Sequence, residues 1–150
     1  MSDARPGEGE LNTGLLLFIP YRALETRVLR AVADAGFDDV TLAQARVLQR
    51  VGPAGSRLTE LAAAAQVTKQ TAGFLVDQLE AAGYVRRRPD PRDGRARLVE
   101  VAERGLAAAV VADAVVAEVE AEWAAHLGAE RMAALRSALV ALREVTDPFR

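Results

Sequence analysis

A cluster of arginines is the most chemically distinctive feature of this 150-residue chain. A guanidinium group forms paired hydrogen bonds with phosphate oxygens and base edges, and it enters narrow minor grooves, where the negative potential of DNA is deepest. The six arginines of the cluster are Arg86, Arg87, Arg88, Arg92, Arg95 and Arg97. Their type and density predict a nucleic-acid contact surface rather than a reaction centre.

Two short β-strand patterns flank a turn within this cluster and predict a hairpin that projects the arginines from the protein. Asp93-Gly94 is the expected turn, because glycine adopts a positive φ without steric cost. Arg92 and Arg95 should then lie at the tip, and the carboxylates of Asp90 and Asp93 should pair with them and fix their direction. The residues expected to shape this wing are Asp90, Asp93 and Gly94. A solvated basic hairpin without a partner is the alternative.

A pair of short helices is expected directly before the hairpin. The apolar spacing predicts helices over residues 58–65 and 69–82, with Thr59 and Thr68 as N-caps and Gly83 ending the second helix. The side chains expected to form a shared seam between them are Leu61, Ala62, Val67, Thr71, Ala72, Leu75 and Leu79. Two helices followed by a basic hairpin predict a winged helix-turn-helix, which is a DNA-reading module.

The free face of the second helix begins with short polar residues and a glycine, namely Thr68, Lys69, Gln70 and Gly73. Recognition helices enter the major groove by their N-terminal end, where amide, hydroxyl and cationic groups read base edges. An ordinary solvated helix face is the alternative, and the adjoining hairpin favours DNA contact. The predicted DNA contacts are Thr68, Lys69, Gln70, Thr71, Arg86, Arg92, Arg95 and Arg97.

Five motifs follow one another along this region: Leu61-Ala62, Thr68-x-x-Thr71, Leu75-Val76-Asp77-x-Leu79-Glu80, Gly83-Tyr84-Val85 and Asp90-x-Arg92-x-x-Arg95. The set resembles the core of the MarR family of bacterial transcriptional regulators, and the resemblance extends over nearly the whole chain. It implies a homodimer that binds a pseudo-palindromic operator, with recognition helices in major grooves and wings in the flanking minor grooves. It also implies a regulator that is most often a repressor, and that in many members releases DNA when a small aromatic or anionic ligand binds.

Three positions depart from the family's habit. Gln66 stands where a glycine is common, so the backbone there either avoids the left-handed conformation or carries a cost of about 1 kcal/mol. Phe74 and Gln78 stand where charged residues are common; we expect Phe74 to pack in the core, with a thymine methyl contact as the alternative. These departures favour a second interpretation, a winged-helix dimer that serves as a protein-interaction or small-molecule-binding module without reading an operator.

The rest of the chain is predicted to be helical. A helix over residues 10–35 contains Pro20, which should kink it or mark its first turn. Thr41–Gln44 has the pattern of a capping box that starts the next helix. Two further helices are expected over residues 102–126 and 130–145, on either side of a break at Gly128.

We therefore expect a mainly α-helical fold with a small β-hairpin wing, organised as a single MarR-like domain over residues 1–150. Residues 41–101 should form the winged helix-turn-helix module, and residues of about 10–35 and 102–147 the dimerisation helices. The apolar face expected on the first C-terminal helix comprises Leu106, Val110, Val111, Ala114, Val115, Val119 and Trp123. This face is too broad for one small domain to cover, which implies a partner subunit, with packing between the two terminal helices as the alternative.

The overall charge is −2, but its distribution is uneven. Residues 57–97 contain eight basic and five acidic residues, whereas the remainder contains eleven basic and sixteen acidic ones. A basic module is thus set in an acidic frame, which should limit unspecific contacts with polyanions.

Composition argues against several other classes of protein. The absence of cysteine excludes disulfides and thiol-based redox sensing. The one histidine, His126, has no catalytic or metal-binding partners in the sequence, so we expect a helix-end role for it, no enzymatic activity, no metal and no cofactor. The longest apolar run, residues 15–19, is too short for a membrane span, and residues 1–9 lack a signal-peptide pattern, so a cytoplasmic protein is expected.

Aromatic residues that could contact an effector are few. Phe18, Tyr21 and Phe37, with Trp123 as a fourth, are predicted near the place where the family's ligand pocket would lie. Ordinary core packing is the alternative for each. The sequence does not identify a ligand.

Overall fold

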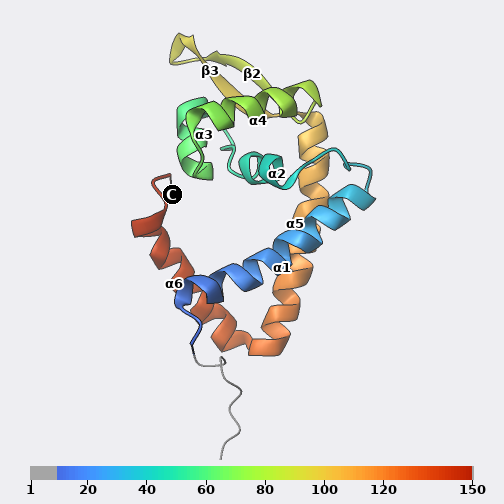
Figure 1. The fold of residues 1–150 in the computed structure, drawn as a ribbon, viewed down its shortest axis with the longest axis vertical. Helices are drawn as coiled ribbons and strands as arrows, with labels where there is room; N and C mark the ends of the chain where they lie inside the picture. The colour runs from blue at the N-terminus through green and yellow to red at the C-terminus, as the bar shows by residue number, and fades with distance from the viewer. Residues whose placement is uncertain (1–9, 150) are drawn as a thin grey trace, which may run out of the picture.

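The structure, a computed structural model, describes residues 10–149, so the stretch 1–9 lies outside the described residues. Its elements are α1 (Thr13–Asp34), α2 (Leu42–Leu48), β1 (Ser56–Arg57), α3 (Leu58–Ala65), α4 (Lys69–Ala81), β2 (Val85–Asp90), β3 (Asp93–Val101), α5 (Glu103–Leu127) and α6 (Ala129–Thr146). Figure 1 shows α2, α3, α4 and the strands gathered into a lobe at one end, with α1, α5 and α6 extending from it. The three strands form an antiparallel sheet in the order β1-β3-β2. The prediction of a mainly helical winged fold is confirmed.

The core of the lobe lies where α3 and α4 meet the sheet. Leu61, Ala72, Leu75 and Leu79 of the predicted seam are buried, together with Val76. Thr71 was expected in this seam, and that expectation is wrong. It is exposed, because the buried positions of α4 follow the helical spacing from Ala72 and leave the preceding residue on the opposite side.

The helix ends follow local hydrogen-bonding rules. Thr68 caps α4, since its Oγ1 accepts from the backbone N–H of Thr71 at 3.1 Å. The predicted start of α3 at Leu58 is confirmed, but the prediction of Thr59 as its cap is wrong: the N-cap is Arg57, whose backbone N–H donates to Glu60 at 3.4 Å. The predicted capping box of α2 is present, with Thr41 and Gln44 bonded in both directions.

The wing turns two residues earlier than expected. Asp90 pairs with Asp93, so Pro91 and Arg92 make the turn and Gly94 belongs to β3, without a positive φ. The reason is local: an aspartate at the first turn position and a proline at the second favour a turn with negative φ angles, and Asp90 Oδ1 accepts from Arg92 N–H at 2.9 Å.

Helix α1 is only half embedded. It runs through Pro20, which therefore lies inside the helix and not in its first turn. Val32 is buried and Val28 is half-buried, whereas Leu15 and Phe18 are exposed. The C-terminal half of α1 thus packs on α5 and α2, and the N-terminal half leaves an apolar surface uncovered.

The lobe is joined to α5 at one very close approach. A Cβ on Gly105 would lie 2.3 Å from the carbonyl oxygen of Tyr84 and 2.7 Å from Val101 Cγ1, so only glycine fits without a shift of the backbone. The same carbonyl accepts from Ala102 N–H at 2.9 Å. Tyr84 itself is fully buried, and the Arg104 guanidinium lies 4.4 Å from its ring centre.

A buried carboxylate ties α1 to α2. Glu25 is 9% exposed and accepts from Arg46 at 2.8 and 3.0 Å, from Arg22 at 2.6 Å and from the Tyr21 hydroxyl at 2.9 Å. These donors, Arg46 foremost, lower the pKa of Glu25 to about 2.

The turn between α3 and α4 carries backbone strain. Gln66 has φ 59° and ψ 44°, and it is the only non-glycine residue with a positive φ in the described part of the chain. Of the two predicted outcomes for Gln66, the left-handed one is therefore confirmed.

We expect Gln66→Gly to raise the free energy of unfolding by about 0.5–1 kcal/mol, because glycine adopts the left-handed conformation without strain. Urea unfolding measures the change. The matched control is Ala63→Gly, within the same helix, where glycine should lower stability by about 0.5–1 kcal/mol. A loss of stability in both variants would contradict the strain at Gln66.

The Glu25 cluster predicts a pH dependence of stability. A depressed carboxyl pKa stabilises the folded state fully above the unfolded value of 4.5, and this contribution is lost as the pH falls toward 2. Glu25→Gln should therefore lower the free energy of unfolding near neutral pH, by up to about 3 kcal/mol, and by much less near pH 3. Urea unfolding at both pH values tests this, and a difference that does not change with pH would contradict it. Glu118→Gln, at an exposed position of α5, is the control.

Candidate nucleic-acid interface and adjoining cavity

The N-terminal turn of α4 presents the predicted polar residues to solvent. Thr68, Lys69, Gln70 and Thr71 are all exposed. The two threonine hydroxyls bond to each other at 2.9 Å, whereas the side chains of Lys69 and Gln70 have no hydrogen-bond partner within residues 10–149. Lys69 and Gln70 are therefore the side chains most available for a ligand.

The three other notable residues of α4 occupy different environments. A Cβ on Gly73 would lie 3.6 Å from Leu58, so this glycine faces α3 and is half-buried. Phe74 is 62% exposed, so the expectation that it packs in the core is wrong. Gln78 accepts from Gln44 Nε2 at 3.0 Å and belongs to the contact between α2 and α4.

The six wing arginines fall into two groups. Arg86 and Arg88 both bond to Glu100 on the neighbouring strand, and this lowers the pKa of Glu100. Arg87 donates to Glu80 at 3.0 Å and to Asp77 at 2.8 Å, which fastens β2 to α4. Arg86, Arg87 and Arg88 thus form a first, paired group. The second group consists of Arg92, Arg95 and Arg97, whose guanidinium groups form no ion pair or hydrogen bond with any residue that the structure describes.

The two wing aspartates hold the backbone instead of the guanidinium groups. Asp90 is 5% exposed; it bonds to the side chain of Arg57 at 2.8 and 2.9 Å and to the N–H of Arg92. Asp93 accepts from the N–H of Arg95 at 3.1 Å. The predicted pairing with the guanidinium groups of Arg92 and Arg95 is thus wrong, because the backbone N–H groups lie closer to these short side chains. The N–H of Arg92, followed by Arg57, lowers the pKa of Asp90 and keeps it charged.

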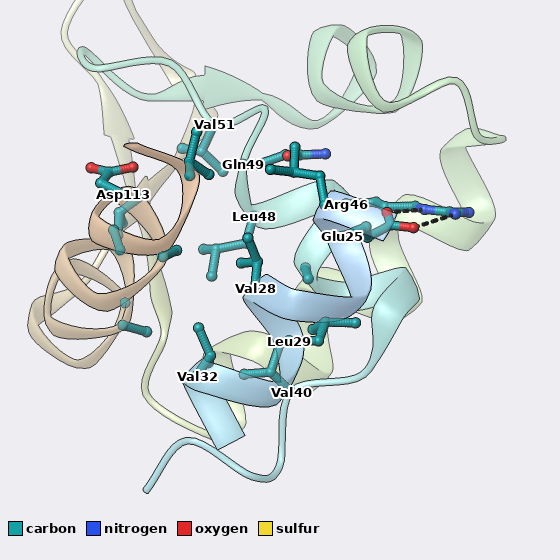
Figure 2. A pocket seen from close by; sticks show the side chains of 18 of the residues that line it. Glu25, Val28, Leu29, Val32, Val40, Arg46, Leu48, Gln49, Val51 and Asp113 are labelled. Atoms are coloured by element: carbon teal, nitrogen blue, oxygen red, sulfur yellow. Dashed lines mark hydrogen bonds and ion pairs between the residues drawn. The ribbon is translucent and has the colours of Figure 1, made fainter. Parts of the chain in front are cut away.

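A cavity of about 370 Å³ lies between α1, α2 and α5, beside the lobe (Figure 2). Its walls are mostly aliphatic, and its polar residues include Glu25, Arg46 and Asp113. Of the aromatic residues predicted near a ligand pocket, Tyr21 lines this cavity, whereas Phe18, Phe37 and Trp123 do not. Phe37 packs edge-on against Tyr84 with 6.3 Å between ring centres.

Other kinds of site find no support in the part of the chain that is described. No group of three or more histidine, cysteine or carboxylate side chains there could hold a metal ion, and His126 is exposed in the last turn of α5. None of the helices between residues 10 and 149 combines the length and the apolar character needed to cross a membrane.

Comparison with known proteins identifies the fold and the family. A sequence model described as MarR family matches residues 38–96. The structure of the MarR family protein Rv2887 of Mycobacterium tuberculosis, in complex with salicylic acid, is 30% identical, with 89% of this chain and 97% of that one covered at a TM-score of 0.63. The transcriptional repressor CouR, bound to a 23-mer DNA duplex, is 26% identical, with 94% and 99% covered at 0.70.

The Escherichia coli protein MarR in its apo form shares the fold, at 24% identity and a TM-score of 0.68, with 89% of this chain and 98% of that one covered. No curated protein sequence matches the chain significantly. The relative from Mycobacterium tuberculosis and the match over residues 38–96 agree with the winged lobe described above. The chain therefore belongs to the MarR family of winged-helix transcription regulators.

Proposed function

We propose that two copies of this chain form a dimer that binds a pseudo-palindromic operator and represses transcription until a small molecule releases it. The observation that carries the proposal is the pairing of an exposed polar turn, at the start of α4, with wing arginines that have no partner in the described chain. Lys69 and Gln70 would approach base edges in the major groove, and Arg92, Arg95 and Arg97 the adjoining minor groove.

The paired arginines have a different role in this proposal. Arg87 donates to Asp77 and Glu80, and these contacts hold the wing against α4, the proposed recognition helix. Arg86 is bonded to Glu100, and a DNA phosphate would have to compete with that carboxylate. The similarity to a repressor solved on a DNA duplex supports this use of the lobe.

Exposed apolar side chains support the dimer. They lie on the N-terminal half of α1, on the outer face of α5 and along α6, outside the winged lobe. They include Leu15, Leu16, Leu17, Phe18, Ile19, Leu106, Val110, Leu135, Leu139, Val140, Leu142 and Val145. Patches of this extent mark interaction surfaces, and a two-fold dimer would match two half-sites of a palindrome.

The cavity supports release by a ligand. It is lined by α1 and α2 on one side and by α5 on the other. A bound molecule would therefore contact α2 of the winged lobe as well as α1 and α5, the helices assigned to the dimer. A relative in this family, Rv2887 of Mycobacterium tuberculosis, has been solved in complex with salicylic acid.

Phe74 favours a second candidate function, an interaction module that does not read DNA. An aromatic side chain that is 62% exposed on the recognition helix suits a protein surface as well as a thymine methyl group. Loss of operator binding in Phe74→Ala, with stability unchanged, would assign this side chain to DNA. Operator binding unaffected by the change would favour a protein contact.

Arg92→Ala and Arg95→Ala should each weaken operator binding by about 1–3 kcal/mol, because each removes an unpaired guanidinium from the wing. Fluorescence anisotropy with the duplex upstream of the chain's own gene, against a shuffled duplex, measures the loss. Arg131→Ala, at the start of α6, is the control for net charge and should bind as the wild type does. Unchanged affinity in folded wing variants would remove the wing from the mechanism, and selection from random duplexes would identify an operator that lies elsewhere.

The apolar surfaces predict a dimer at micromolar concentration, which light scattering coupled to size exclusion would detect. Val110→Glu, on the exposed face of α5, should shift the population toward monomer, because it places a charge in the interface. Lys69→Glu, on the reading lobe, should leave the dimer intact. A monomeric wild-type mass would contradict the proposed dimer.

A further inference from the structure

We propose that Phe74 determines which operator is bound, and that its ring does so by contact with the 5-methyl group of a thymine. This assignment names the base feature that the lobe would read. It rests on the proposed function, because it requires α4 to lie in the major groove of DNA. The position of Phe74 on α4, its exposure and the bonding of its neighbours carry the assignment.

Phe74 lies on the outermost line of α4, the helix beside the hairpin in Figure 1. The buried residues of α4 lie together on the opposite side and are Ala72, Leu75, Val76 and Leu79. Because an α-helix turns by about 100° per residue, Phe74 points about 160° away from Ala72, and so does Gln70, one turn earlier. Gln70 and Phe74 therefore form the part of the helix that would enter a groove most deeply.

The ring of Phe74 is isolated on the surface of the lobe. It is the only large apolar side chain of residues 42–101 that is exposed. The other exposed large apolar side chains of residues 10–149 lie before residue 22 or after residue 105, outside the lobe. A protein partner would be expected to cover a contiguous apolar patch, which a single ring among polar residues does not provide. A methyl group on a base is small enough for one ring to cover.

The residues that follow Phe74 on the outer side of α4 already have partners within the lobe. Asp77 accepts from Arg87 at 2.8 Å, and Gln78 accepts from Gln44 at 3.0 Å. In the second turn of α4, residues 73–76, Phe74 is the only exposed residue. Beyond the first turn of α4, Phe74 is thus the outward side chain that remains available to distinguish one base from another.

Thymine is the base that offers a methyl group in the major groove, at C5, and phenylalanine is among the side chains that contact it. The contact removes apolar surface of both groups from water, so loss of one buried methyl group should weaken binding about fourfold. Gln70, one turn earlier, suits the paired donor and acceptor of adenine. Both residues therefore favour A·T pairs, but only the contact of Phe74 requires the methyl group.

Replacement of thymine by uracil tests this contact, because it removes the 5-methyl group and keeps the hydrogen-bonding groups of the base pair. The probe is the duplex upstream of the chain's own gene or, if that duplex is not bound specifically, the tightest duplex selected from a random library. Anisotropy with the full chain should show about fourfold weaker binding for each half-site in which the contacted thymine is replaced. Substitution of one thymine at a time identifies that base.

Three variants assign the loss to the ring. At the base so identified, Phe74→Ala should bind the thymine and uracil duplexes equally, and Phe74→Leu should retain part of the preference because it keeps an apolar side chain. Since Phe74 is exposed, neither change should lower stability, which urea unfolding measures. Gln70→Ala, the matched control on the same line of α4, should weaken binding but leave the ratio of the two dissociation constants unchanged.

The outcomes separate this assignment from the proposed function. If a duplex is bound specifically but no uracil substitution weakens binding, or if Phe74→Ala loses as much affinity with uracil as the wild type does, Phe74 does not read a methyl group and the proposed regulator stands. Operator binding by Phe74→Ala as tight as that of the wild type would overturn the assignment in favour of a protein partner. If no duplex is bound specifically even after selection, operator reading itself fails, and the assignment of Phe74 fails with it.

Discussion

The close contact between Gly105 and the carbonyl of Tyr84 sets how the winged lobe is attached to α5. It lets the first turn of α5 lie directly against the residue that joins α4 to β2, a distance that no larger side chain allows. Tyr84 fixes the lobe from the other side, since its buried hydroxyl bonds to Asp39 and burial raises its pKa to about 12. The recognition helix, the wing and the long helix therefore meet at one closely packed junction. Gly105 also lines the cavity.

Much of the fold follows from local rules that the sequence displays. Helix caps such as Thr68, and the capping box at Thr41, were predictable because their hydrogen bonds join residues three apart. The position of the wing turn was missed because Asp93-Gly94 is a strong signal that the preceding Asp90-Pro91 overrides. Phe74 was predicted to pack in the core because it is a large apolar residue. The buried residues of α4 are spaced along the opposite face of the helix, so Phe74 is exposed to solvent.

The residue types of the candidate site could be predicted from the sequence, but the pairing of its arginines with carboxylates could not. The density of arginines indicated a DNA surface, yet which of them are available depends on carboxylates that folding brings to them. Glu100 lies opposite Arg86 only in the register of β2 and β3, and Asp77 reaches Arg87 only because α4 packs beside the hairpin. The cavity was expected to contain aromatic side chains, and its aliphatic walls come from three helices whose packing no short pattern encodes.

The division of the wing arginines has a consequence for the thermodynamics of association. A cation that contacts DNA phosphate displaces condensed counterions, and each such contact steepens the dependence of the binding constant on salt by about 0.9 in a double-logarithmic plot. Arg86, Arg87 and Arg88 are already neutralised by Glu100, Glu80 and Asp77, so they would displace few counterions. Half of the wing's arginines would therefore add little to the salt dependence of binding. The complex would retain more of its affinity at high ionic strength than six arginines in one hairpin suggest, and a larger share of that affinity would come from contacts that depend on base sequence and groove shape.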